Sequence, residues 1–524
     1  MKMEAAATSR SPFAGTRLSW ALTPLHIAAV LTIAALGVRL IGISMRPLWL
    51  DEAYSAWFSS QSWHDLWTVV PTYETHPPFY YSLLKLWRFA FGGSAVALRL
   101  PSAILGAATV PVVMVAAREL ERLRPTGRPM LLMGVAGFLA ACGPTLVEHG
   151  QEARPYAPMA FAYAIAILGL LKLLADFAEC KAGSPRNWII LALGSELTLW
   201  SHALGIIYAA CIAIALLPAW LKRPVPKERI SRGLTAAASI LALYLPCLWL
   251  IAGRTGDWGS GWISWEPEML LTLLSIYGVP VEVLTIGSAV AALILFLLAK
   301  RAIAFGIKGR GWNADRALLV LWWGVPLTTA LVSALIVPVF LPRTLTATLV
   351  PFYLVVAAAL ARTESTKERL ALAAALAVTL FPSTIAMALR PATEPWDQVD
   401  AFLQGNVHPG DIVWLYPNDS ALPLRAAGPR SAYPRHGIPA DYPALDVVAP
   451  RHAGSPAVPS MTAESMQRLM HSTEGSRART IWLVTSQEQY FDPHNELARA
   501  LSAARRPGPK QRWQYLRVQP FTLR

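Results

Sequence analysis

The chain has 524 residues, of which 54% are hydrophobic and only 15% charged, and its formal net charge is +14. A soluble protein of this size would carry about 25% charged residues, so the composition excludes an ordinary soluble enzyme. The positive charge does not indicate nucleic-acid binding, because many basic residues lie in short loops between apolar segments rather than on one soluble face.

Long apolar segments recur from near the N-terminus to about residue 390. They approach the roughly 20 residues that a helix needs to cross a bilayer, and they predict a polytopic α-helical membrane protein with about eleven transmembrane helices. No small-residue cleavage site follows the first segment, so we expect it to be an uncleaved signal anchor. The predicted spans are 25–43, 97–117, 130–146, 156–176, 188–200, 203–220, 234–252, 280–299, 317–338, 345–361 and 369–388.

Basic residues set the orientation of these spans, because cytoplasmic loops carry an excess of Lys and Arg. With residues 1–24 in the cytoplasm, the first loop (45–96) lies outside. The stretch 79–91 is then a helix along the outer surface, with Trp87 and the tyrosines at the interface, since counting it as a span would reverse the next loop. The basic inside loops are 118–128, 181–186, 222–232, 300–316 and 362–369.

The same orientation gathers the polar, aromatic-rich motifs on the outer side, although the charge rule did not use them. We therefore expect one outward-facing site. The motifs are the first loop, residues 148–156, the turn at Ser201-His202, the loop 253–265 and Leu341-Pro342-Arg343.

Asp51 and Glu52 follow directly after the first apolar segment. One acid could cap a helix, but two adjacent acids beside a membrane are costly to desolvate and call for a functional explanation. A carboxylate can accept the proton of a hydroxyl or an amine as that group attacks an electrophile. The pair is the leading candidate for general-base chemistry.

Two candidates follow in the first loop. His76 precedes Pro77 and Pro78, and Pro78 suits the first position of a helix. A lone histidine here is more often a structural hydrogen-bonding residue. Lys85 on the same helix either extends its side chain to the membrane interface or contacts a lipid phosphate.

Further candidates lie in the later outer loops. Glu152 and Arg154 in Gln151-Glu-Ala-Arg-Pro-Tyr156 form either a structural ion pair or a phosphate site, for which Arg is well suited. His202 is equally consistent with a structural histidine and a site residue. Arg343 is the basic residue of its outer loop and opposes the orientation trend, which favours phosphate binding.

Other chemistries lack a motif. The sequence contains no Walker A loop, no GxGxxG after a strand and no HExxH, so nucleotide-driven and zinc-protease chemistry are not supported. The four cysteines form no CxxC pair and no disulfide framework. No metal cluster stands out, and a requirement for a divalent metal stays open.

The tail, residues 391–524, is predicted to be a small soluble α/β domain outside the membrane. Apolar runs at 411–416 and 480–484 predict buried strands, and 395–403 a helix. The Pro-rich stretch 422–459 is predicted to be loop.

Four features occur in a fixed order along the chain and resemble those of a known family. They are Leu48-Trp-Leu-Asp-Glu-Ala53, His76-Pro-Pro-Phe-Tyr-Tyr81, Gln151-Glu-Ala-Arg-Pro-Tyr156, and Arg343 before a last pair of spans. The chain resembles the GT-C-type integral membrane glycosyltransferases, in the bacterial branch related to protein O-mannosyltransferases and to the aminoarabinose transferase of lipid A. The resemblance covers about residues 20–390 and makes 25–390 a GT-C-like catalytic domain.

The resemblance implies an inverting glycosyltransferase that moves a sugar from a polyprenyl-phosphate donor to an acceptor glycan, lipid or protein. It implies a multi-pass protein of the bacterial inner membrane, with its site and tail in the periplasm among membrane lipids. Asp51 is then the catalytic base, and Glu52 positions the acceptor or supports Asp51. Candidates for binding donor or acceptor are His76, Lys85, Glu152, Arg154, Tyr156, His202 and Arg343.

Two other functions compete with this one. A transporter or flippase of a lipid-linked or anionic solute would need polar residues at mid-depth and matched broken helices. Here the charges concentrate at one face, with Glu196 as the main intramembrane exception. A membrane scaffold would leave the polar outer loops unexplained. The sequence therefore favours the transferase.

Overall fold

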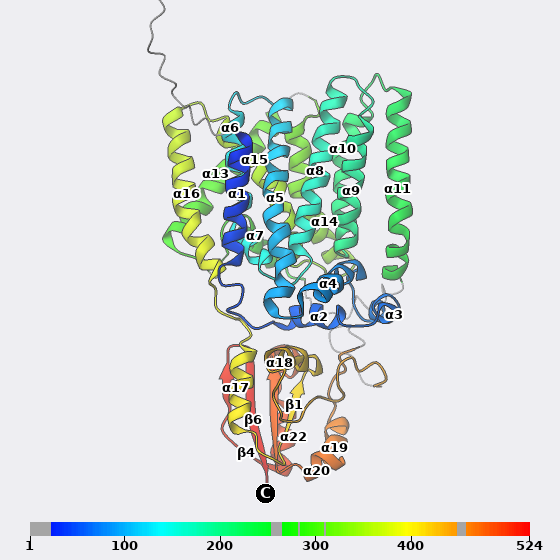
Figure 1. The fold of residues 1–524 in the computed structure, drawn as a ribbon, viewed down its shortest axis with the longest axis vertical. Coiled ribbons are helices and arrows are strands. Elements are labelled where there is room, and N and C mark those ends of the chain that lie inside the picture. The colour runs from blue at the N-terminus through cyan, green and yellow to red at the C-terminus, as the bar shows by residue number, and fades with distance from the viewer. Residues whose placement is uncertain (1–22, 253–264, 281–282, 309–310, 448–456) are drawn as a thin grey trace, which may run out of the picture.

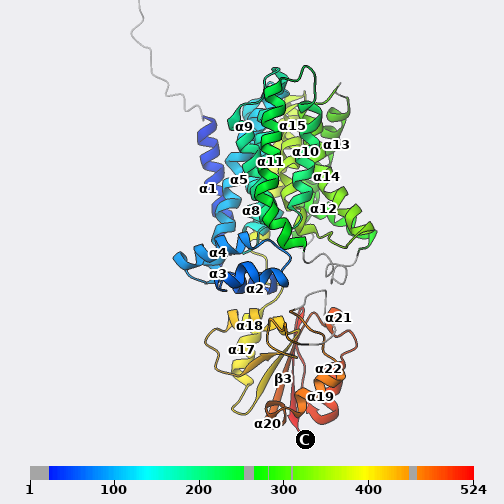
Figure 2. The ribbon, with the colours of Figure 1, turned by 90° about the vertical axis from the view of Figure 1, so that its right-hand side faces the viewer.

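The computed structural model describes residues 23–252, 265–280, 283–308, 311–447 and 457–524. A bundle of upright helices stands over three short helices, and a small α/β domain lies below them (Figures 1 and 2). The predicted fold class, a helical membrane protein with a small C-terminal α/β domain, is confirmed. Most of the predicted N-terminal segment and of the predicted loop 253–265 lies outside the described residues.

Seven helices of the described residues are long and apolar enough to cross a membrane, and a bent pair would make eight. Every predicted span overlaps one of these helices or a shorter helix of the bundle. The long ones are α5 (Ala95–Leu123), α8 (Tyr156–Ala178), α11 (Lys227–Ala252), α13 (Ile286–Lys308), α14 (Ala314–Leu335), η5 with α15 (Pro342–Thr348, Leu349–Ala361) and α16 (Thr366–Ala388). The others are α1 (Pro24–Leu40), α6 (Pro129–Cys142), α7 (Pro144–Gly150), α9 (Pro185–Ser201), α10 (Gly205–Trp220), η3 (Pro267–Leu271) and α12 (Thr272–Tyr277).

The bent pair is α6 and α7, whose axes differ by 50°. A break inside the bundle leaves carbonyl groups at the end of α6 without helical partners. The fully buried Arg39 of α1 supplies donors: its guanidinium group bonds the carbonyls of Ala141 at 3.0 Å, Ala140 at 3.2 Å and Leu146 at 3.4 Å. Arg39 thereby stabilises the bend that directs α7 towards the outer loop 148–156.

The predicted inside loops meet at the end of the bundle away from the α/β domain. Asp315, at the start of α14, accepts from Arg124 of the α5–α6 loop at 2.8 Å and from Arg362 after α15 at 3.0 Å. Three loops far apart in the sequence, all of them predicted to lie inside, are therefore tied together at one end of the bundle.

The first loop forms α2 (Leu50–Phe58), α3 (Trp63–Thr68) and α4 (Pro78–Phe91), which lie beneath the bundle (Figure 1). The helix α4 is not among the candidate spans, in agreement with the prediction of a surface helix. Its apolar side chains Leu83, Leu86 and Phe89 are exposed along one side, as in a helix that lies at a membrane surface. The expected interfacial position of the tyrosines is wrong, because Tyr80 and Tyr81 are buried in a core with α2 and α5.

The C-terminal domain has one sheet, with strand order β2-β1-β3-β6-β4 and β5 paired to β6. The strand β1 runs parallel to β2 and β3, and β6 is antiparallel to β3. The predicted strands at 411–416 and 480–484 are confirmed as β1 and β3, which are buried throughout. The strands are β1 (Ile412–Tyr416), β2 (Arg435–Gly437), β3 (Thr480–Ser486), β4 (Arg505–Pro507), β5 (Gln511–Trp513) and β6 (Leu516–Leu523).

Helices cover both faces of this sheet. Trp396 of α17 packs with Val413 on one face, and Met466 of α19 packs with Trp414 on the other. The prediction of a continuous loop over 422–459 is wrong in part, because this stretch contains most of α18 and all of β2. The helices of the domain are α17 (Trp396–Asn406), α18 (Ala421–Ala427), α19 (Ala463–His471), α20 (Thr473–Arg477), α21 (Glu488–Phe491) and α22 (Glu496–Ala504).

Candidate active site at the loop end of the bundle

Helix α2 carries both predicted acids in its first turn, where the partial positive charge of a helix N-terminus stabilises carboxylates. Successive residues of an α-helix point roughly 100° apart. Asp51 and Glu52 therefore face different surroundings, although they are neighbours in sequence.

Glu52 is fully buried and turned into the protein. Its carboxylate accepts two hydrogen bonds from Arg99 of α5, at 2.7 and 2.6 Å, and one from the backbone N–H of Ala153 at 2.8 Å. Both oxygens are thus engaged inside the protein. Glu52 and Arg99 also border the cavity described below, but the carboxylate is held by Arg99 and Ala153 and fastens α2 to α5.

Asp51 faces two arginines from separate loops. Its Oδ2 atom lies 3.3 Å from Nη2 of Arg343 in η5 and 3.6 Å from Nη2 of Arg154. Arg154 also donates to the backbone carbonyl of Asp51 at 3.2 Å. The Asp51 side chain keeps 18% of its surface exposed and Arg343 keeps 27%. Both side chains therefore keep part of their surface accessible, although Oδ2 of Asp51 is itself buried.

The two predicted histidines complete this group. Arg154 donates to Nε2 of His76 at 3.3 Å, and the rings of His76 and His202 lie 4.3 Å apart. Burial lowers the pKa of His76 well below its usual range, and His202, Arg154 and Arg343 lower it further. Burial, followed by the two arginines, lowers the pKa of His202 to about 3. Both rings are neutral near pH 7, so the positive charge here comes from arginine.

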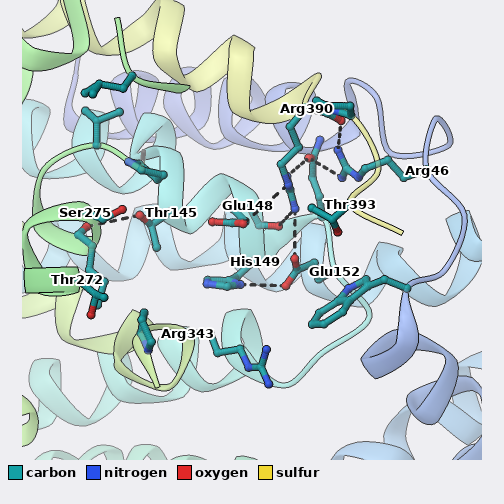
Figure 3. Close-up of a pocket in the computed structure, with 18 of the residues that line it drawn as sticks. Arg46, Thr145, Glu148, His149, Glu152, Thr272, Ser275, Arg343, Arg390 and Thr393 are labelled. Carbon is teal, nitrogen blue, oxygen red and sulfur yellow. Dashed lines mark hydrogen bonds and ion pairs between the residues drawn. The ribbon is translucent and has the colours of Figure 1, made fainter. Parts of the chain in front are cut away.

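Figure 3 shows a second polar cluster, around Glu152, in the same pocket as Arg343 of the first group. Glu152 contacts His149 at 2.9 Å and Arg390, which follows α16, at 3.2 Å. Burial alone would raise the pKa of Glu152, but His149 and Arg390 outweigh it and hold the pKa below its usual range. Arg390 and Arg46 both donate to the side-chain oxygen of Gln151, at 3.1 and 3.0 Å.

This cluster lines a cavity of about 920 Å³ that also includes Arg343 and Trp49. Its opposite side is apolar and comes from η3, α12 and the residues that follow, among them Leu271, Leu274 and Val279. A cavity of this kind can hold an anionic head group together with an apolar chain.

Of the two remaining predicted residues, one lies in the group of site residues and the other does not. Tyr156 belongs to the group, because its ring lies 5.0 Å from that of His149 and 5.9 Å from that of His202. Lys85 does not, since its ammonium group donates to the backbone carbonyl of Gln61 and lies 5.5 Å from the ring centre of Trp63.

Sequence reasoning missed the arginines at positions 46, 99 and 390. Arg390 follows the last predicted span on the outer side, so the argument that selected Arg343 would have found it. Arg99 lies inside the predicted span 97–117. An ionisable residue within a span usually pairs with another charged group, so its presence there could have indicated the ion pair.

In the part of the chain that the structure describes, no three His, Cys, Asp or Glu side chains form a group that could hold a metal ion. The carboxylates of Asp51, Glu52 and Glu152 each pair with arginine instead.

No family model and no curated protein sequence matches the chain. Among solved structures it is similar to ArnT from Cupriavidus metallidurans in the apo state, with TM-score 0.62 and 13% identity over 94% of this chain and 97% of that one. The same protein bound to undecaprenyl phosphate matches with TM-score 0.60 at the same identity and coverage.

A third similar structure is the oligosaccharyltransferase AglB from Archaeoglobus fulgidus, in complex with an inhibitory peptide and a dolichol-phosphate. Its TM-score is 0.54, with 13% identity over 92% of this chain and 72% of that one. A likeness at this identity concerns the fold and not the activity. The chain has the fold of the GT-C integral membrane glycosyltransferases.

Proposed function

We propose that this protein is an inverting glycosyltransferase that moves a sugar from a polyprenyl-phosphate donor to an acceptor. The observation that carries the proposal is the pairing of Asp51 with Arg154 and Arg343 beside a cavity that is polar on one side and apolar on the other. The apolar side suits a polyprenyl chain, and the arginines suit its phosphate.

In this proposal Asp51 accepts the proton of the acceptor hydroxyl as its oxygen attacks the anomeric carbon. The bond between that carbon and the phosphate oxygen breaks, and its electron pair leaves with the phosphate. Arg154 and Arg343 stabilise the charge that develops there. The neutral rings of His76 and His202 serve as hydrogen-bonding groups, and Glu152 with Tyr156 shapes the adjoining wall.

The similar structures support a lipid-linked donor. One was solved with undecaprenyl phosphate and another with a dolichol-phosphate, which are long-chain polyprenyl-type phosphates. We extend this donor class to the present chain. The acceptor is a glycan, a lipid or a protein at the membrane surface.

Comparative mass spectrometry of glycans and glycolipids, with and without the gene, tests the function. We expect one sugar substituent to disappear from cells that lack the gene and to return with the wild-type gene. Purified protein in liposomes that also contain an acceptor-bearing membrane extract should transfer the sugar to that acceptor and release free polyprenyl phosphate from the sugar-charged donor. Movement of intact donor across the liposome membrane without release would identify a flippase instead.

We place the site and the C-terminal domain in the periplasm of a bacterial inner membrane, on the strength of the positive loops at the opposite end of the bundle. Cys180 is exposed beyond α8 at that opposite end, and the other three cysteines are buried. In cells with a permeabilised outer membrane, an impermeant maleimide should label Gln398→Cys in a Cys180→Ser background but leave native Cys180 unlabelled. Labelling of Cys180 before lysis would overturn this orientation.

A further inference from the structure

Two residues of the C-terminal domain hold helix α2, one at its first residue and one a turn later. Its first residue, Leu50, donates its backbone N–H to Oε2 of Glu394 at 3.0 Å. One turn later, the hydroxyl group of Tyr54 donates to Oδ2 of Asp419. Asp51 lies between these two contacts.

The first contact is a helix cap supplied from far along the sequence. The first N–H groups of an α-helix have no partner within the helix, and Trp49, the residue before α2, provides no side-chain cap. Glu394, between α16 and α17, fills this role and also accepts from the indole of Trp396 at 2.9 Å. Glu394 is buried at the edge of the cavity, so it joins the C-terminal domain to the wall of the site.

The second contact comes from the sheet of the C-terminal domain. Asp419 follows β1, whose two parallel neighbours lie on opposite sides of it. In sheets of this kind, the carboxyl ends of the parallel strands usually face a ligand. Here the carboxyl end of β1 faces α2. Asp419 is 3% exposed, and burial raises its pKa to about 6. Aromatic packing adds to the contact between Tyr54 and Asp419, because the ring of Tyr442 lies 5.4 Å from that of Tyr54 and 6.0 Å from that of Trp57.

We propose that Glu394 and Asp419 are positioning residues that fix α2 from the C-terminal domain, so that Asp51 faces Arg154 and Arg343. A helix of nine residues is marginal on its own, and misplacement of a reacting group by about 1 Å can cost 10²-fold in rate. In this proposal the C-terminal domain helps to hold the residues of the site in position. The catalytic meaning of this inference rests on the proposed function, whereas the anchoring of α2 does not.

Hydrogen–deuterium exchange of the full-length protein in lipid nanodiscs tests the anchoring. Tyr54→Phe, Asp419→Ala and Glu394→Ala should each raise amide exchange in residues 50–58 by about ten-fold, as expected for the loss of a hydrogen bond to a charged group. Asp419→Asn, which keeps an acceptor oxygen, should restore most of the protection. Glu474→Gln is the matched control, because its side chain is 51% exposed and distant in α20. Unchanged exchange in all three variants would overturn the proposal.

Activity separates positioning from a purely structural role. Tyr54→Phe should lower kcat for sugar transfer and leave KM for the donor and binding of undecaprenyl phosphate unchanged, with Asp419→Asn close to wild type. A parallel loss of binding and turnover would contradict positioning. If α2 exchanges faster as expected but the wild-type protein transfers no sugar, the anchoring stands and the proposed function fails.

Discussion

Asp51→Asn is expected to lower sugar transfer by about 10²- to 10⁴-fold, which is the usual contribution of a general base. The amide has nearly the shape of the carboxylate but cannot take up the acceptor proton. It also removes an anion that lies within 3.3–3.6 Å of two arginines. Undecaprenyl phosphate should therefore bind the variant at least as tightly as the wild type. Transfer and binding are measured on the purified protein in nanodiscs.

Asp51→Glu is the matched control. It keeps the charge and the partners but moves the carboxylate by about one bond length, so transfer should fall while thermal stability stays close to wild type. Near-normal turnover of Asp51→Asn would contradict the assignment of the base. A loss of undecaprenyl phosphate binding together with turnover would mean that Asp51 organises the site rather than acting on the acceptor.

Arg99→Met should destabilise the protein by about 3–5 kcal/mol, because it leaves the Glu52 carboxylate buried without its partner. The midpoint of thermal unfolding in detergent, followed by tryptophan fluorescence, measures the loss. Arg301→Met is the control: Arg301 pairs with Glu368 at 2.6 Å, but the two side chains are 43% and 44% exposed, and an exposed pair contributes about 0–1 kcal/mol.

A double variant sharpens this test. Glu52→Leu with Arg99→Met removes both charges, so it should unfold at a higher temperature than either single variant. Equal stability of Arg99→Met and the wild type would show that the pair does not hold α2. Low transfer in the folded double variant would fit a role for Glu52 in supporting Asp51.

Hydropathy predicted the helices, and loop charge predicted which loops lie at the same end of the bundle and therefore the face on which the motifs meet. This was possible because a bilayer imposes span length and charge bias on the sequence itself. The contact of Asp51 with Arg343 follows from that shared face. Composition and spacing could not divide Asp51 from Glu52, since their division depends on the rotation of α2 about its axis; it was expected only from the resemblance to the GT-C transferases. That rotation is set by Arg99, Glu394 and Asp419.

The positions of two further sets of residues have physical reasons. Lys85 has the right charge and the right loop, yet its long side chain finds a nearer acceptor in the carbonyl of Gln61. The tyrosines of α4 were expected at the lipid interface, but the helix turns Tyr80 and Tyr81 inward and presents Leu83, Leu86 and Phe89 instead. Composition identifies a surface helix, and only its packing decides which side faces the lipid.

That exposed apolar side of α4 suits the surface of a lipid leaflet. The cavity lies at the same end of the bundle, because residues of the first loop between positions 46 and 52 line it. The proposed isoprenoid donor would therefore reach it by lateral diffusion while its chain stays among the lipid tails. Encounter would then take place in two dimensions. The concentration that governs saturation is the mole fraction of donor in the leaflet, and kinetic measurements should vary lipid composition at constant bulk concentration.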